Sequence, residues 1–404
     1  MSNKTISENQ LIALVSIIQF VHVVDFMMVA PLGPDFAKSL GFSLSDIGWI
    51  VGVFAAAAAV SAFFSAKYLD RFERRGLLNF CLIGMAGGTC WAGLATDFEH
   101  LLFARIVTGL FGGPANAVAI ALIIDKVPNE RRGRAMGIVM GAFSIASILG
   151  LPIGLYLATW FGWQAPFFAI TVLLLLLVVL NLILLPKSEQ APTHGLKRFQ
   201  FRKFFNRRVT WLCLLMNMSA LFAAFLLIPH ISSYIQFNRD YPRDDLGFLY
   251  LVGGLASFIL MRITGPAVDR RGAFMLSLIA TLLAIASVYL GFYAQYLWFS
   301  MPLLFFFFMG AMSMRNVVAT TVTSMVPDDH ERAAFMSING AIQHASAAFG
   351  AFISSQIVSN GGHGEIIGMA KLALMAMLIY ALLPVFVMLI EKSQLGRKNQ
   401  SLTS

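Results

Sequence analysis

Charged residues are scarce in this sequence: they make up 12% of its 404 residues, whereas soluble domains average about 25%. Apolar residues make up 58%, and 36 of them are phenylalanine. The interior of a soluble protein of this length is too small to bury so many apolar side chains. The excess must face lipid, which excludes a soluble globular protein.

Cysteine and the common catalytic motifs are also rare or missing. The three cysteines, Cys81, Cys90 and Cys213, lie inside apolar stretches and match neither a zinc spacing nor a disulfide framework. The sequence contains no Walker glycine-rich loop, no HExxH helix and no GxSxG turn. We therefore expect no metal, no cofactor and no ATP site, and we consider an enzyme or a receptor the least favoured class.

Apolar stretches alternate with short polar links along the whole chain. Each stretch reaches the roughly 20 residues that a membrane-spanning helix needs. We therefore predict an all-α integral membrane protein with twelve transmembrane helices, at about 11–36, 45–66, 76–96, 101–124, 133–158, 165–186, 209–236, 244–266, 273–293, 297–325, 332–358 and 366–391. An even number of spans places both termini on one side.

The basic residues indicate which side that is. Most of the 29 lysines and arginines fall in links on the side of the termini, while four fall opposite: Lys38, Arg239, Arg243 and Lys371. By the positive-inside rule the richer side is cytoplasmic. We expect a multi-pass protein of the bacterial plasma (inner) membrane, a monomer whose basic links contact anionic lipids and bind no nucleic acid.

Two sequence patterns occur twice, in the same order. The stretch "YLDRFERR" (68–75) recurs as "AVDRRGA" (267–273), and "KVPNERRGRAM" (126–136) recurs as "MVPDDHERAAFM" (325–336). Such internal similarity is typical of transporters built from a duplicated unit. The predicted domains are a six-helix bundle (1–186), a basic linker (187–208), a second six-helix bundle (209–391) and a cytoplasmic tail (392–404). The linker mixes basic residues with Phe, which favours a solvated segment with an interfacial helix or a regulatory site.

The stretch 66–75 resembles the cytoplasmic motif between helices two and three of the major facilitator superfamily. The matching residues are Asp70, Arg71 and Arg74, and the second copy carries Asp269 and Arg270. The resemblance implies the major facilitator fold, two pseudo-symmetric six-helix bundles. It also implies a gate, in which these charges pair across the two halves while the cytoplasmic side is closed. Ordinary positive-inside links are the alternative.

Two later stretches narrow the resemblance. "ARIVTGLFGG" (104–113) resembles the Arg-and-Gly motif of proton-coupled exporters, and "GAFSIASILGLPIG" (141–154) loosely resembles the antiporter motif of the twelve-helix drug:proton antiporter and sugar-efflux branch. The resemblance gives Arg105 a coupling role with an acid on the first helix. We expect the glycines and Pro152 of the second stretch to permit close backbone approach between the halves; a kinked packing helix without a role in export is the alternative.

Asp25 is the acid that we place deepest in a predicted span. It lies about 21 Å along a helix that begins at Leu11, at about 1.5 Å per residue. A carboxylate at that depth is costly, about 2.5–3.5 kcal/mol. Gln19, His22 and Asp25 follow one another at intervals of three residues and share one helix face. We predict that Asp25, with His22 and Arg105, couples transport to protons; a purely structural ion pair is the alternative.

Other polar residues in the spans are candidates for substrate binding. Arg315 lies near the middle of its span with no acid in its half, so we expect it to pair with Asp25 or to contact an anionic group of the substrate. Met28 and nearby Phe side chains supply an apolar wall. The full predicted set is Gln19, Met28, Asn116, Asn217, Arg315, Asn339 and Gln343.

Three functions remain open at this stage. The first is a secondary active exporter that moves a small amphipathic solute or drug out in exchange for protons, by alternating access. The second is a symporter, a uniporter or a lipid flippase of the same fold, for a sugar, metabolite or lipid. The third is a membrane enzyme or receptor. The patterns at 104–113 and 141–154 favour the first.

Overall fold

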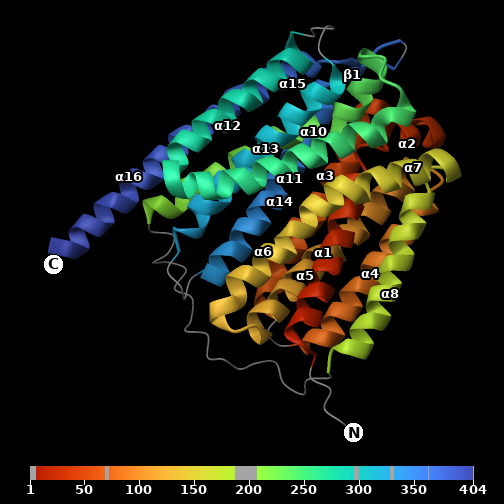
Figure 1. The fold of residues 1–404 in the computed structure, drawn as a ribbon. Coiled ribbons are helices and arrows are strands. Elements are labelled where there is room, and N and C mark those ends of the chain that lie inside the picture. The colour runs from red at the N-terminus through yellow and green to blue at the C-terminus, as the bar shows by residue number, and fades with distance from the viewer. Residues whose placement is uncertain are drawn as a thin grey trace.

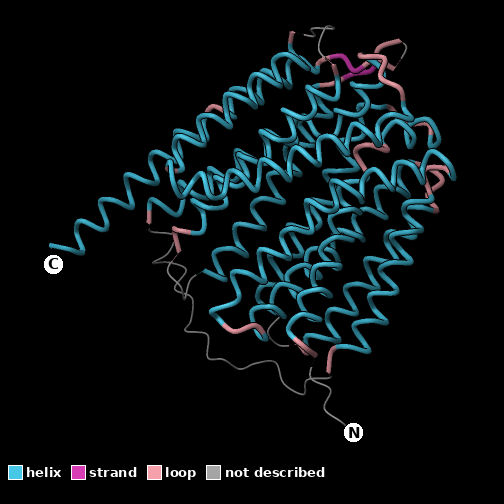
Figure 2. The backbone as a smooth tube through the Cα atoms, in the orientation of Figure 1, coloured by secondary structure: helices cyan, strands magenta, loops and turns pink. Residues whose placement is uncertain are grey.

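The computed structural model describes residues 6–68, 72–186, 207–294, 300–327, 332–362 and 364–403. The longer helices are α1 (Glu8–Met28), α3 (Ile47–Tyr68), α4 (Arg74–Gly93), α5 (Phe98–Lys126), α6 (Asn129–Ile145), α7 (Leu151–Phe161), α8 (Ala165–Leu184), α10 (Arg208–Asn238), α11 (Leu246–Arg271), α12 (Ala273–Val288), α13 (Met301–Ser324), α14 (Arg332–Ile357), α15 (Met369–Tyr380) and α16 (Leu382–Thr403). Figure 2 shows that helices make up almost the whole tube.

Short elements occupy the connections. They are α2 (Gly33–Leu40), the 3₁₀ turns η1 (Leu44–Asp46) and η4 (Arg243–Asp245), the π-helical turns η3 (Ala146–Gly150) and η5 (Tyr289–Tyr293), and the strands β1 (Ser359–Asn360) and β2 (Ile366–Ile367). The two strands pair antiparallel. The turn η3 joins α6 to α7 into one span, and η5 extends α12.

Local sequence sets several helix ends. Ser7 and Gln10 form a capping box at the start of α1, which satisfies two backbone N–H groups of the first turn. Asp97 caps α5 by accepting from the backbone N–H of His100. Gly41 ends α2 with a φ of 71°, a left-handed conformation that glycine adopts without steric cost.

Eleven spans formed by the described helices are long and apolar enough to cross a membrane. The helix α14 is not one of the eleven, although its 26 residues are long enough, because it carries polar side chains such as Asn339, Gln343 and His344. With α14 the spans number twelve, at the positions predicted from the sequence. The fold is therefore the predicted all-α membrane architecture of twelve transmembrane helices.

The two parts of the chain lie side by side (Figure 1). We call α1–α8 the first half and α10–α16 the second half. We call the end of the bundle at Glu8, where α16 also ends, the terminal face, and the opposite end the distal face. The predicted linker 187–208 falls almost entirely outside the described residues. The predicted tail 392–404 is helical as far as Thr403, because α16 continues straight through it.

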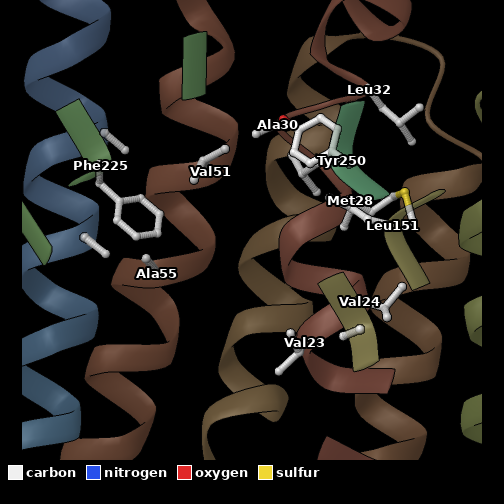
Figure 3. Packing of buried hydrophobic residues seen from close by; sticks show 14 of the residues in the cluster. Val23, Val24, Met28, Ala30, Leu32, Val51, Ala55, Leu151, Phe225 and Tyr250 are labelled. Carbon is white, nitrogen blue, oxygen red and sulfur yellow. The ribbon is translucent and has the colours of Figure 1, made fainter. Parts of the chain in front are cut away.

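The halves pack against each other near the distal face. There α3 of the first half runs along α14, and α7 with η3 runs along α11. Figure 3 shows Phe225 of α10 pointing toward Val51 and Ala55 of α3, while Tyr250 of α11 lies beside Met28 at the end of α1. These residues belong to one continuous apolar cluster, so the distal ends of the two halves share a core.

Glycine permits the closest of these approaches. A side chain at Gly254 of α11 would stand 2.8 Å from the backbone carbonyl of Ser147 in η3, so the two helices meet backbone to backbone. Gly154 of α7 likewise leaves room for the thioether of Met28. The stretch 141–154 does approach α11 closely, but the glycine at that contact is Gly254 of the second half. Gly150 and Gly154 lie against Val24 and Met28 of the first half, so the expectation that the glycines of the stretch itself bring the halves together is wrong.

Candidate functional site

Asp25 is fully buried in the last turn of α1, within hydrogen-bonding distance of two other helices. Its Oδ2 accepts from Nη1 of Arg105 on α5 at 3.0 Å, and its Oδ1 accepts from the hydroxyl of Thr89 on α4 at 3.0 Å. Both carboxylate oxygens therefore have partners, as a buried charge requires. The predicted pairing of Asp25 with Arg105 is confirmed, within the first half.

A second set of contacts fixes the arginine. The Arg105 guanidinium lies over the ring of Phe54 on α3, with its carbon 4.4 Å from the ring centre, a cation–π contact. Its Nη2 also reaches the backbone carbonyl of Asp25 at 3.5 Å. Gly109, one turn further along α5, lets α3 approach, since a side chain there would strike the carbonyl of Phe54. Arg105 is thus held between α1 and α3, 1% exposed.

His22 lies one turn before Asp25 and shares its buried helix face with Gln19. Its Nδ1 has no hydrogen-bond partner among the described residues, and its ring stands 6.3 Å from that of Phe54. His344 of α14 lies close enough for the two imidazoles to interact electrostatically.

The second half has its own buried polar cluster. Asn217 of α10 donates to the hydroxyl of Thr323 on α13 at 2.8 Å and accepts from the amide of Gln343 on α14 at 3.1 Å. One turn away on α14, the Oδ1 of Asn339 is buried without a partner among the described residues. Three of the predicted substrate-binding residues, Asn217, Asn339 and Gln343, are thus brought together.

Arg315 does not pair with Asp25 in this structure, and that alternative is corrected here. Its Nη1 donates to the hydroxyl of Thr281 on α12 at 2.9 Å and to the backbone carbonyl of Tyr380 at 3.0 Å. The guanidinium also lies 4.2 Å from the centre of the Tyr380 ring. The expectation left out a further kind of partner: a backbone carbonyl freed at a helix break can also accept from a buried arginine.

Two further predicted substrate residues lie in different surroundings. Met28 is 1% exposed and packs against α7 beside Gly154 and Leu151, so it fills a helix contact in this conformation. Asn116, two residues after Pro114 inside α5, keeps a buried Oδ1 without a partner among the described residues.

The predicted gate residues Arg74, Asp269 and Arg270 lie at the terminal face. Asp70 and Arg71 fall outside the described residues. Arg74 contacts Asp125 at 3.2 Å, within the first half. Asp269 and Arg270 are exposed in the last turn of α11 and form no ion pair with any other described residue. Among the described residues, Asp269 and Arg270 therefore show no ion pair across the halves at this face.

Sequence analysis missed three contributors to the sites. Thr89 and Phe54 complete the surroundings of the Asp25–Arg105 pair. A single threonine and a single phenylalanine among many apolar residues form no sequence pattern that predicts these contacts. Arg243 forms an ion pair with Asp35 across the halves at 2.7 Å. In the sequence, Arg243 stands out only as one of four basic residues on the side opposite the termini. That scarcity is the one sequence feature that points to a role for Arg243.

Twelve spanning helices in two halves, with an ion pair and amide side chains buried among them, define a multi-pass membrane transport protein. The sequence matches the family model of the Major Facilitator Superfamily over residues 15–351. The chain belongs to this superfamily, so it is a transporter and not an enzyme.

Three curated relatives of the chain are named for drug resistance or for efflux. It is 29% identical to a chloramphenicol resistance protein of Streptomyces lividans, over 64% of this chain and 66% of the relative. It is 25% identical to a probable sugar efflux transporter of Pasteurella multocida, over 84% and 82%. It is 26% identical to the purine ribonucleoside efflux pump NepI of Salmonella paratyphi A, over 66% of each.

Solved structures show the same fold at low identity. A bacterial homologue of the human lysosomal transporter Spinster, inward-facing and occupied, superposes with a TM-score of 0.72 at 16% identity, covering 95% of this chain and 97% of that one. The nucleoside transporter NupG gives a TM-score of 0.73 at 12% identity, covering 94% and 99%. These similarities establish the fold.

Proposed function

We propose that this protein exports a small amphipathic solute in exchange for protons, by alternating access. The observation that carries the proposal is the fully buried Asp25–Arg105 pair. Burying two charges in an apolar interior is costly, and ionisable residues inside membrane spans commonly serve transport. The relatives' names support the direction of transport, since they describe resistance and efflux. Transport, and the membrane location, follow from the family itself.

The proton step is assigned to Asp25. A carboxylate holds Arg105 by charge and by hydrogen bonding, and a neutral carboxyl holds it much less. Protonation of Asp25 therefore loosens a contact that ties α1 to α5, and deprotonation restores it. His22, one turn away, has an Nδ1 without a partner among the described residues, and we assign to it the transfer of the proton to and from Asp25.

The substrate is assigned to the polar groups of both halves. Asn217, Asn339 and Gln343 offer amide donors and acceptors from the second half, and Gln19 and Asn116 offer them from the first. The apolar wall includes Met28. The Asp25–Arg105 pair is neutral overall, so Arg315 leaves the buried charges with an excess positive charge. That balance favours a neutral or anionic solute.

The gates and the orientation complete the proposal. Both termini face the cytoplasm of a bacterium, across its inner membrane. The terminal face is then the cytoplasmic mouth, where Asp70, Arg71, Arg74, Asp269 and Arg270 pair while that mouth is closed. Protons and membrane lipids are the other partners, and the protein acts as a monomer.

Replacing Asp25 tests the coupling. In proteoliposomes with an imposed pH gradient, Asp25→Asn should lower gradient-driven flux at least about 100-fold, the usual contribution of a positioned proton-transfer group. Exchange of substrate without a gradient should persist. The substrate for this assay comes from a thermal-shift screen of neutral and anionic amphipathic solutes.

Thr171→Val is the matched control. Thr171 is buried in the same half and its hydroxyl bonds only the backbone of its own helix, at Phe167, so the variant should transport as the wild type does. Full pH-driven flux in Asp25→Asn would contradict proton coupling at this residue. Wild-type flux that ignores the gradient would favour a uniporter or a flippase instead.

A further inference from the structure

An ion pair at the distal face joins the two halves. Arg243, at the start of η4 in the second half, donates from Nε to both oxygens of Asp35 at 3.2 and 3.0 Å, and from Nη2 to Oδ2 at 2.7 Å. Asp35 stands in the first turn of α2, in the first half. Paired donation from a planar guanidinium to a carboxylate is the strongest common form of side-chain ion pair.

The same arginine contacts a second element of the first half. Its Nη1 lies 3.5 Å from the hydroxyl of Thr159 near the end of α7. The side chains of Arg243 and Asp35 are 23% and 28% exposed, so water reaches them only in part. An ion pair in such surroundings is weakened by screening less than a fully exposed one.

A second polar contact between the halves lies at the same face. The side chain of Asn360, in the β1–β2 hairpin, accepts from the backbone N–H of Ser45 in η1 at 3.2 Å. Just below, Gly48 of α3 lies so close to α14 that a side chain would strike the carbonyl of Ala351. We call Asp35, Arg243, Thr159, Ser45 and Asn360 the distal clasp.

The clasp has no counterpart at the terminal face among the described residues. The ion pairs there, Arg74 with Asp125 and Arg131 with Glu8, each stay within the first half. Alternating access requires the two faces to separate in turn. Contacts that join the two halves at the distal face therefore favour the state in which that face is closed.

We propose that Asp35 and Arg243 form the gate of the distal face and set how often that face opens. The inference rests on the proposed alternating-access function and adds to it a pair of residues outside the predicted gate motif. When the distal face opens, Asp35 leaves Arg243 and Thr159, and both charges return to water. Loss of either charge should therefore favour opening.

The test measures distances on purified protein, without any substrate. Spin labels at Lys38 and Asp244, exposed positions of the two halves near the clasp, report the width of the distal face in a background with the three cysteines replaced. Asp35→Asn and Arg243→Gln should each raise the distal-open fraction about tenfold. The double variant should raise it no further, because both changes remove one interaction.

Two further variants sharpen the result. Exchanging the charges, Asp35→Arg with Arg243→Asp, should return part of the closed population. Asp97→Asn is the matched control: this acid lies at the same face, but its partner His100 belongs to the same half. Near-isosteric Asp35→Asn is the variant least able to disturb folding, so it decides the case alone if the exchanged pair does not fold.

Distance distributions of Asp35→Asn and Arg243→Gln that match the wild type would overturn the clasp. The result of the distance measurement does not depend on whether transport is coupled to protons. If the clasp variants widen the distal face while wild-type flux ignores the pH gradient, the gate stands and the exchange with protons does not.

Discussion

At the scale of single residues, Asp97 offers a measurement outside the membrane spans. The backbone N–H of His100 donates to its Oδ1 at 2.9 Å and holds the pKa of this carboxyl below its ordinary value. A lowered pKa means that the ionised form stabilises the folded state. This contribution is complete above the ordinary pKa of about 3.9 and is lost as the pH falls through the lowered value.

Asp97→Asn keeps a good helix cap but removes the titration. We therefore expect the wild type to melt at a higher temperature than Asp97→Asn at pH 6, and the difference to shrink as the pH falls below 4. Thermal unfolding in detergent between pH 3 and 6 measures this. A difference that stays constant with pH would show that the charge of Asp97 does not stabilise α5.

Single residues also show what sequence can reveal about the site. Asp25 and Arg105 were predictable because a charge within an apolar span is conspicuous and needs a partner. Thr89 was not, since a threonine fits anywhere in a membrane helix by bonding its own backbone. Only the folded structure, in which α4 packs against α5 and α8, shows that its hydroxyl donates to Asp25.

At the scale of helices, Arg315 and Pro384 act together. In a continuous helix the carbonyl of Tyr380 would accept from residue 384, but proline has no N–H. The chain breaks there between α15 and α16, and Arg315 donates to the freed carbonyl. A proline inside a span interrupts the hydrogen bonds of its helix, but the sequence does not indicate which side chain from elsewhere satisfies the freed carbonyl.

A double-mutant cycle tests this account. Arg315→Met should lower the free energy of unfolding by about 1–3 kcal/mol, because buried acceptors lose their donor. Pro384→Ala restores an N–H to the helix, so the same arginine substitution should cost about 1 kcal/mol less in that background. Unfolding in detergent by a chemical denaturant measures each step.

Arg262→Met is the control for the cycle. Arg262 also lies within a span, but it is exposed and rests on Phe258 of its own helix. Its replacement should cost the same in the wild-type background and in the Pro384→Ala background. Strictly additive costs for Arg315→Met and Pro384→Ala would show that Arg315 does not serve the break, and its assignment to substrate would gain weight.

At the scale of the whole molecule, the terminal face tests the predicted motif gate. Asp70→Ala should favour opening of this face, and Asp269→Ala should do so less if the first copy of the motif caps a helix of the second half. Spin labels at Lys126 and Arg271, exposed positions of the two halves, should report longer distances. Asp244→Ala, at the distal face, is the control.

Unchanged distances in both variants would refute a gating role and leave the motif with a role only in orienting the chain in the membrane.

The whole-molecule arrangement was largely predictable, because hydropathy places the spans and basic links orient them. The distal clasp was not, since Asp35 and Arg243 are far apart in the sequence and each looks like an ordinary surface charge. Only the relative placement of the halves brings them together.

The polar character of α14 has a consequence for how the protein is made. A segment with Asn339, Gln343 and His344 near its middle enters lipid by itself much less readily than the other spans. Its packing partners, α3 and α10, both precede it in the chain. Synthesis from the N-terminus therefore delivers both neighbours to the membrane before α14 leaves the ribosome, so the order of the helices gives this helix a protein surface to insert against.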